Sequence, residues 1–279
     1  MKEIDSLRFG PGGIPTTVTK GGLLEGINEI KRLGLGSMEM EFVRQVYVKE
    51  DKTLPIKELA VKQDVVLTSH ASYYINLNSA DPATRKASAQ RLLQAARITA
   101  MCGGYSTCVH AAYYQKDSHQ LVSQRVKEHL KDILKMLHDE GHEVWVRPET
   151  GGKINQFADS YDLIAFSAEV EGVLPCFDFA HQYSRTLGKW NTTEEFRKLL
   201  SEIEKKLGKK GLHNMHIHME GIEFTERGEK NHVNLDECPF RYKDLLKVWK
   251  EFGLKGVVTC ESPNLEQDAL VLQKLYKSL

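Results

Sequence analysis

The stretch Leu174-Pro-Cys-Phe-Asp-Phe-Ala-His181 is the one that decides the fold. It begins as an apolar run of the length that a buried strand needs, and it ends with two side chains that can bind a metal ion, Asp178 and His181. Other apolar segments along the chain also end in histidine or glutamate: Ser69-His70, Val109-His110, Pro148-Glu149, Met215-His216-Ile217-His218 and Cys260-Glu261. Because catalytic groups of parallel barrels lie at the carboxyl ends of the strands, this pattern predicts one site built from many strand ends.

Strand-like and helix-like segments alternate along the whole chain. Predicted strands cover residues 7–10, 37–43, 64–70, 107–110, 143–149, 174–178, 211–221 and 254–261. Apolar residues at helical spacing predict helices over 23–33, 81–103, 118–138, 161–170, 194–207, 242–252 and 265–279. This order predicts an α/β protein with a (β/α)8 TIM barrel, formed by residues 1–279 as a single domain. An open doubly wound sheet has little support because no G-x-G-x-x-G follows the first strand.

Two segments leave their roles open. Ser37-Met-Glu-Met-Glu-Phe-Val43 alternates apolar and acidic residues, so Glu39 and Glu41 share one face. That face is either the exposed side of a half-buried strand or part of a functional site. Residues 225–239 are polar and irregular, and we interpret them as a functional loop.

Composition places the chain among ordinary globular proteins. It has 41% apolar and 27% charged residues, and its 38 basic and 38 acidic residues cancel. A neutral chain lacks the strongly basic character of many nucleic-acid-binding domains, although a local basic patch stays possible. The sequence lacks an apolar stretch long enough to cross a bilayer, and Met1-Lys-Glu-Ile-Asp5 does not resemble a signal peptide. We therefore expect a cytoplasmic protein whose five cysteines are reduced and buried, rather than disulfide-bonded or bound to metal.

The candidate metal ligands are histidines and carboxylates: His70, His110, Glu149, Asp178, His181, His216, His218, His232 and Glu261. Such nitrogen and oxygen donors suit zinc or another divalent first-row ion. One zinc ion takes about four ligands, so this excess predicts two or three metals, with Glu149 as a possible bridge. Any one histidine alone is more often held by a backbone hydrogen bond. Burying all of them at one mouth would be costly without metals.

At these residues the sequence resembles the endonuclease IV family of apurinic/apyrimidinic endonucleases, within the xylose-isomerase-like TIM barrels. His70-Ala-Ser-Tyr73-Tyr-Ile-Asn-Leu77 resembles the family's H-x-S-Y-x-I-N-L, and Asp178-Phe-Ala-His181 resembles its D-x-x-H. The resemblance covers nearly the whole chain. It implies hydrolysis of the DNA backbone 5′ of an abasic site in base excision repair, leaving a 3′-hydroxyl.

The resemblance also implies a set of residues for each of three zinc ions, with manganese as a possible substitute. The first ion would take His70, His110 and Glu149, and the second would take Glu149, Asp178, His216 and Glu261. His181 and His232 would hold the third. Glu149 and Glu261 would act as catalytic groups, and a hydroxide shared by the first two ions would attack the phosphodiester. Tyr73 would contact damaged double-stranded DNA, and the protein would be a monomer.

Two departures from the family pattern leave alternatives open. The family's D-x-H corresponds here to Glu229-Lys-Asn-His232, so Lys230 takes the place of the aspartate unless Glu229 substitutes for it. In the seventh strand His216 and His218 face the same side, and the family pattern favours His216.

Two other functions compete with the nuclease. The first is a sugar isomerase or epimerase that uses Glu149 and Glu261 around one divalent ion. The second is a module that binds abasic DNA without cutting it. Basic residues that could meet a DNA backbone are Arg44, Lys153, Arg185 and Lys230, although each alone is more typical of a solvated surface.

Overall fold

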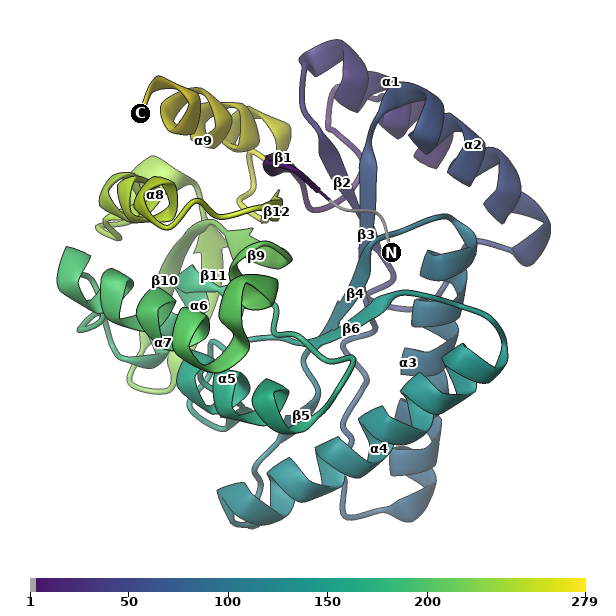
Figure 1. Cartoon of the computed structure of the whole chain (residues 1–279), viewed down its shortest axis with the longest axis vertical. Coiled ribbons are helices and arrows are strands. Elements are labelled where there is room, and N and C mark those ends of the chain that lie inside the picture. The colour runs from purple at the N-terminus through teal and green to yellow at the C-terminus, as the bar shows by residue number, and fades with distance from the viewer. Residues whose placement is uncertain (1–3) are drawn as a thin grey trace.

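Eight parallel strands close into a barrel in the computed structural model, which describes residues 4–279 (Figure 1). The strands are β1 (Leu7–Pro11), β2 (Ser37–Glu41), β3 (Val66–His70), β4 (Ser106–Val109), β6 (Trp145–Pro148), β8 (Phe177–Asp178), β9 (Met215–Met219) and β12 (Gly256–Cys260). They form two ladders, β2-β3-β4-β6 and β1-β12-β9-β8. Parallel bridges between Gly12 and Glu39, and between Glu149 and Cys176, join the ladders at both seams. The predicted (β/α)8 barrel is confirmed.

Helices surround this barrel in chain order, as Figure 1 shows. They are α1 (Leu23–Leu33), α2 (Thr53–Gln63), α3 (Pro82–Met101), α4 (His119–Asp139), α5 (Ser160–Glu169), α6 (Phe179–Arg185), α7 (Thr193–Leu212), α8 (Tyr242–Glu251) and α9 (Glu266–Ser278). Each of the longer helices buries one apolar stripe against the strands; on α4 the stripe is Val122, Val126, Leu130, Ile133 and Leu137. Within residues 4–279, no helix combines the length and apolar character needed to cross a membrane.

Helix α2 was missed in the sequence. Its third residue is Pro55, which weakens a helical pattern, yet the first turn of a helix needs no amide hydrogen at that position. Helices α3 and α4 begin where their capping residues predict, because Asp81 and Ser118 each accept a hydrogen bond from backbone amides of the first turn.

The deciding stretch is more strongly bent than we expected. Strand β8 covers Phe177 and Asp178, and α6 begins directly afterwards. Asp178 caps α6 by accepting a hydrogen bond from the His181 amide at 2.6 Å. Because they are three residues apart at a helix start, the two side chains lie close together.

The segment after β9 is an ordered hairpin, so the prediction of an irregular loop over 225–239 is wrong for its first part. Strand β10 (Gly221–Thr225) pairs antiparallel with β11 (Gly228–Val233), and a 3₁₀ turn, Leu235–Glu237, follows. The polar residues misled the prediction because a hairpin standing outside a barrel wall needs no apolar face. A second small ladder pairs β5 (Ala112–Tyr113) with β7 (Gln156–Phe157), and a further 3₁₀ turn, Glu50–Lys52, precedes α2.

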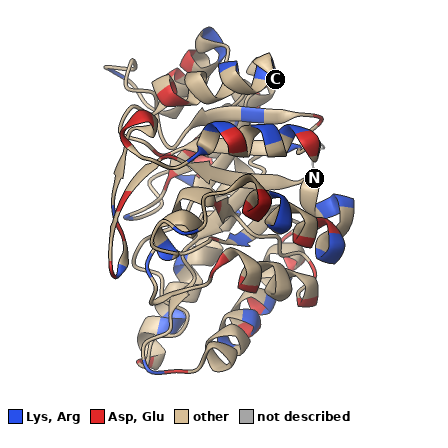
Figure 2. Cartoon of the chain, turned by 90° about the vertical axis from the view of Figure 1, so that its left-hand side faces the viewer, with Lys and Arg blue, Asp and Glu red and all other residues tan. Residues whose placement is uncertain are grey.

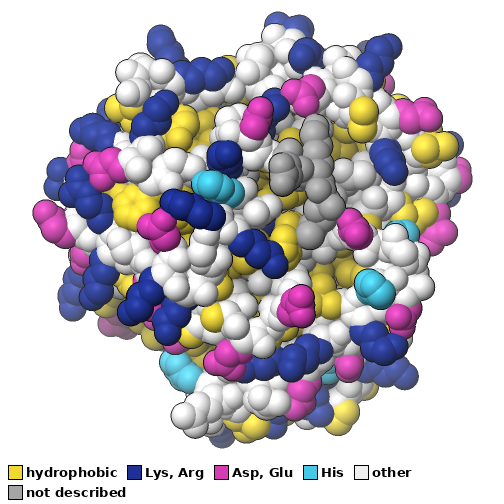
Figure 3. Space-filling model, in the orientation of Figure 1, with side chains coloured by type: hydrophobic (Ala, Val, Ile, Leu, Met, Phe, Trp, Pro, Cys, Tyr) yellow, Lys and Arg dark blue, Asp and Glu magenta, His cyan; other side chains and the backbone are white. Residues whose placement is uncertain are grey.

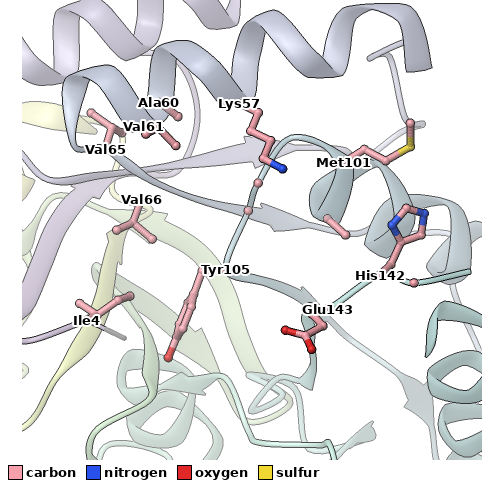
Figure 4. Close-up of a pocket in the computed structure, with 14 residues that line it drawn as sticks. Ile4, Lys57, Ala60, Val61, Val65, Val66, Met101, Tyr105, His142 and Glu143 are labelled. Atoms are coloured by element: carbon pink, nitrogen blue, oxygen red, sulfur yellow. The ribbon is translucent and has the colours of Figure 1, made fainter. Parts of the chain in front are cut away.

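The amino-terminal end of the barrel is closed by a buried cation among aromatic rings. The Arg147 guanidinium donates hydrogen bonds to the carbonyls of Pro175 at 3.0 Å and Asn214 at 2.7 Å. Its central carbon lies 5.3 Å and 5.5 Å from the ring centroids of Tyr105 and Trp145. A cavity of about 500 Å³ lies at this end, where Figure 4 shows Tyr105 among its lining residues.

Charges of both signs are spread over the exterior. Lysines and arginines stand beside aspartates and glutamates along the outer helices in Figure 2, and the face in Figure 3 mixes the same two classes. These views agree with a chain of zero formal net charge.

Candidate metal centre

The predicted strand-end side chains meet at the carboxyl end of the barrel. His70 ends β3, His110 follows β4, Glu149 follows β6, and Glu261 follows β12. They surround a cavity of about 400 Å³ whose lining comprises His70, Tyr73, His110, Tyr113, Lys153, Gln156, His181, Glu229, His232 and Glu261. The larger cavity of Figure 4 lies at the opposite end, so the chemistry of the lining, rather than size, identifies the site.

Glu149 is the centre of this cluster and is fully buried. Its Oε2 lies 3.1 Å from His70 Nε2 and 3.7 Å from His110 Nε2. Its Oε1 lies 3.2 Å from His218 Nδ1 and 3.4 Å from His181 Nδ1. Burial alone would raise the pKa of this carboxyl, but the charges of His110 and His218 outweigh burial and hold the pKa well below its usual range. Glu149 is therefore an ionised carboxylate within reach of four imidazoles.

Possible ligand atoms form three adjoining groups. In each group, the donor atoms lie within 4.8 Å of one another. The groups are His110–Glu149–His181, Glu149–Asp178–His218–Glu261, and His181–Glu229–His232. Neighbouring groups share Glu149 or His181, as expected where metals are bridged. His70 belongs to a further group with Cys108 and Glu149.

Backbone carbonyls orient two of the histidines. A ring nitrogen of His70, Nδ1, donates to the Ala71 carbonyl at 2.7 Å, and Nδ1 of His181 donates to the Thr150 carbonyl at 2.9 Å. The other nitrogen, Nε2, faces the cluster, where it could bind a metal ion after losing its proton. This arrangement is typical of histidines that bind metals.

Several buried polar atoms of the cluster have no hydrogen-bond partner among the described residues. They are His110 Nδ1, Asp178 Oδ2, Glu41 Oε1 and both carboxylate oxygens of Glu220. An unsatisfied buried polar group costs about 1–3 kcal/mol. Divalent ions would compensate this cost, and the nitrogen and oxygen donors suit zinc or manganese, so the residues present fit a metal cluster.

In the structure His218, rather than His216, is the histidine of β9 that lies beside Glu149, whereas the sequence-based preference for His216 as the ligand stays a prediction. His218 lies with Glu149, Asp178 and Glu261, whereas His216 lies one step deeper in β9, with its Nδ1 2.8 Å from Ser106 Oγ. Both rings face the interior because residues two positions apart in a strand lie on the same face.

The hairpin supplies the third group through Glu229 rather than Lys230. Glu229 Oε2 lies 3.6 Å from His181 Nε2, and His232 Nε2 lies 3.3 Å from the same nitrogen. Lys230, on the other face of β11, donates to exposed Glu223 at 3.0 Å. The cation that takes the aspartate's place therefore points away from the site.

Three acidic residues near the cluster were not among the candidate metal ligands, although the sequence left a functional role open for the face that Glu39 and Glu41 share. Glu39 is fully buried, which excludes a half-exposed strand β2. Burial, together with the charge of Glu39, raises the pKa of Glu41 to about 8. Burial and the charge of Asp178 raise the pKa of Glu220 well above its usual range. The alternation in Ser37–Val43 was the available signal for the first two, and the position of Glu220 directly after β9 was the signal for the third.

The residues considered for DNA contact are dispersed. Tyr73 is 59% exposed at the cavity rim, with its ring centroid 5.3 Å from that of His70. Lys153 lines the cavity, and Arg44 is exposed. Arg185 instead supports the loop beside the site, donating to the carbonyls of Gly151, Lys153 and Ile154.

Comparison with known proteins gives one sequence relative and many structures. Residues 27–278 match the model of the family described as xylose isomerase-like TIM barrel. An uncharacterized protein of Methanocaldococcus jannaschii is 38% identical over 273 residues, which covers 98% of either chain.

Solved structures with the same fold include a nuclease and two epimerase-type proteins. Endonuclease IV from Thermus thermophilus superposes with a TM-score of 0.75 at 17% identity, covering 97% of this chain and 98% of that one. A D-tagatose 3-epimerase-like protein gives 0.70 at 17% identity, with coverages of 92% and 94%. The 3-keto-D-glucoside 4-epimerase of E. coli gives 0.69 at 14% identity, with coverages of 98% and 100%. At these identities the likeness shows the fold alone.

Proposed function

We propose a function from the premise that this chain belongs to the xylose isomerase-like TIM-barrel family. The function is that of a metal-dependent phosphodiesterase of the endonuclease IV type, which hydrolyses the DNA backbone 5′ of abasic sites. The observation that carries the proposal is the third ligand group, His181–Glu229–His232, which adjoins the groups around Glu149. Three adjoining groups exceed what a one-metal enzyme needs.

Different residues of the chain would hold the ions and contact the substrate in this reaction. His70, His110 and Glu149 would hold one ion, Glu149, Asp178, His218 and Glu261 a second, and His181, Glu229 and His232 a third. Bound there, divalent ions would supply Lewis acidity for an in-line phosphoryl displacement. The shared carboxylate of Glu149 fixes the spacing of the first two groups. Tyr73 and Lys153 stand at the rim, where an aromatic ring and a cation can contact a sugar-phosphate backbone.

A sugar epimerase is the second candidate, and one group favours it. Glu149, Asp178, His218 and Glu261 form a compact four-donor set that could hold one ion by itself. Its two glutamates could then exchange a proton with a sugar carbon, as general acid–base catalysis requires. This function gives no role to His232 and Glu229.

The test combines metal content with cutting of a defined substrate. Protein purified without chelator should contain at least two zinc or manganese ions per chain by elemental analysis. It should cut a duplex oligonucleotide at a single abasic site to leave a 3′-hydroxyl, and it should spare the matched duplex without the lesion. Chelator should abolish cutting, and zinc or manganese should restore it.

Two results would contradict the proposal. Cutting that survives complete chelation would exclude metal-dependent hydrolysis by this chain. About one ion per chain, no cutting and epimerisation of a ketose would instead support the second candidate.

A further inference from the structure

A second cluster of possible ligands lies inside the barrel, below the candidate metal centre. Cys108, Cys176, His216 and His218 place one donor atom each within 4.8 Å of one another. All four side chains are completely buried. Unlike the donors at the mouth, this set includes two sulfur atoms.

Strand register brings these four residues together. Cys108 is in β4, and Cys176 forms a bridge with Glu149 just before β8. His216 and His218 are two positions apart in β9, so both rings lie on the same face of the strand, toward the interior. The cluster is therefore fixed by the barrel wall itself and needs no movable loop.

One sulfur–nitrogen distance matches an edge of a tetrahedral site. Cys108 Sγ lies 3.6 Å from His218 Nε2. A zinc ion bound at about 2.3 Å to sulfur and about 2.0 Å to nitrogen places those two ligands about 3.5 Å apart. The Cys108 thiol also lies 3.5 Å from the Ser69 carbonyl and 3.8 Å from Glu39 Oε1, so its surroundings are polar.

The orientation of His216 also fits a ligand. Its Nδ1 lies 2.8 Å from the Ser106 hydroxyl. Its buried Nε2 lies 2.9 Å from Oε2 of Glu39 but makes no well-directed hydrogen bond within the described residues. A ligating histidine typically anchors one nitrogen to a neighbouring polar group and leaves the other for the metal. The same Glu39 carboxylate lies 3.0 Å from Nε2 of His218, and its negative charge favours a cation here.

We propose that Cys108, Cys176, His216 and His218 form an interior metal site that binds one zinc ion. Two thiolates and two imidazoles select soft or borderline ions such as zinc over magnesium or calcium. His218 would serve the interior through Nε2, while its Nδ1 faces Glu149 and Glu261 at the mouth at 3.2 Å and 3.5 Å. With an ion at each nitrogen, the ring would be an imidazolate whose remaining proton has been released to solvent. The ring of His218 thus links the two sites, and the interior ion would fix its position.

The first test uses the unaltered protein. X-ray absorption at the zinc edge should show sulfur scatterers at about 2.3 Å. Replacing zinc by cobalt should give an intense near-ultraviolet band from thiolate-to-cobalt charge transfer. Zinc surrounded only by nitrogen and oxygen, together with a cobalt protein that lacks this band, would overturn the proposal and leave the four residues as a hydrogen-bonded core.

Variants locate the site and separate it from the mouth. The double variant Cys108→Ser/Cys176→Ser should lose one metal per chain and the thiolate band, whereas the control Cys102→Ser, also buried, should keep both. Glu229→Gln should lose a metal but keep the band, because Glu229 belongs to the mouth. If the double variant kept the band, the assignment would be wrong. Failure to cut abasic DNA with the band present would reject the proposed function alone.

Discussion

At the scale of single residues, Glu149 contacts more of the other candidate ligands than we expect of any one side chain, because it lies at the centre of the site. Its carboxylate lies between two ligand groups, so removing its charge should disturb both. We expect Glu149→Gln to lower abasic-site cutting at least about 100-fold, because an amide is a poor ligand and carries no charge. Folding should change little, since the amide keeps the shape of the side chain. Cutting assays and thermal unfolding would measure the two effects.

The control for this prediction is the exposed glutamate Glu171. Glu171→Gln should leave both cutting and stability unchanged. Near-wild-type cutting by Glu149→Gln would contradict its bridging role.

Glu41 gives a prediction about pH for the metal-free protein. Burial and the charge of Glu39 raise the pKa of Glu41 to about 8, so the folded state keeps a proton that the unfolded state loses above its ordinary pKa. A raised carboxyl pKa contributes stability at low pH that is lost as pH rises through the folded value. In excess chelator, the free energy of unfolding should therefore fall between about pH 5 and pH 8, and Glu41→Gln should reduce that fall. Urea unfolding at four pH values would measure it; equal slopes for both proteins would contradict the assignment.

The sequence predicted which residue types would gather at the strand ends better than it predicted which side chains would lie next to each other. His70, His110, Glu149 and Glu261 stand where strands end, so position alone made them candidates. His216 and His218 differ by two residues on one strand, and both are ionisable and buried. Which of them reaches Glu149 depends on the depth of each in the barrel, and depth is set by strand register, which one sequence does not contain.

At the scale of elements, the β10–β11 hairpin adds donors to a complete barrel. Its neighbouring residues Glu229 and Lys230 point in opposite directions, toward His181 and toward Glu223. We expect Glu229→Gln to remove about one metal per chain and to slow cutting at least about tenfold, because one charged ligand is lost. Elemental analysis and the cutting assay would report these effects.

Lys230→Gln is the matched control on the same strand. It should keep the metal content, because its ammonium group does not face the site. Metal loss in Lys230→Gln with retention in Glu229→Gln would show that the hairpin assignment is reversed.

The hairpin and α6 also show where pattern-based prediction stops at this scale. Long helices such as α4 were predicted because their apolar stripe repeats along the whole helix. Strand β8 has two residues, and its apolar neighbours Phe179 and Ala180 belong to a helix. Hydrophobicity over so short a span does not distinguish a buried strand from a buried helix start.

At the scale of the whole molecule, the two ends of the barrel have different roles. Arg147 closes the amino-terminal end through two carbonyls and two aromatic rings, at the end opposite the candidate metal centre. We expect Arg147→Met to lower the free energy of unfolding by about 3 kcal/mol, because Pro175 and Asn214 would lose their buried donor. Denaturant unfolding would measure the loss, and metal content should stay that of the wild type. Metal loss without a change in stability would contradict this division.

The barrel itself was predictable because eight repeats of one pattern average out local errors. Missing α2 and overestimating β8 did not alter the count of strands. The substrate was not predictable in the same way, since a nuclease and an epimerase-like protein have the same barrel fold.

The placement of Glu229 and His232 on a hairpin outside the wall has an evolutionary consequence. A short insertion between two barrel strands can add or delete a cation-binding position while every core residue stays in place. The number of donor atoms around the cavity can therefore change through this one peripheral part, without any change to the barrel core.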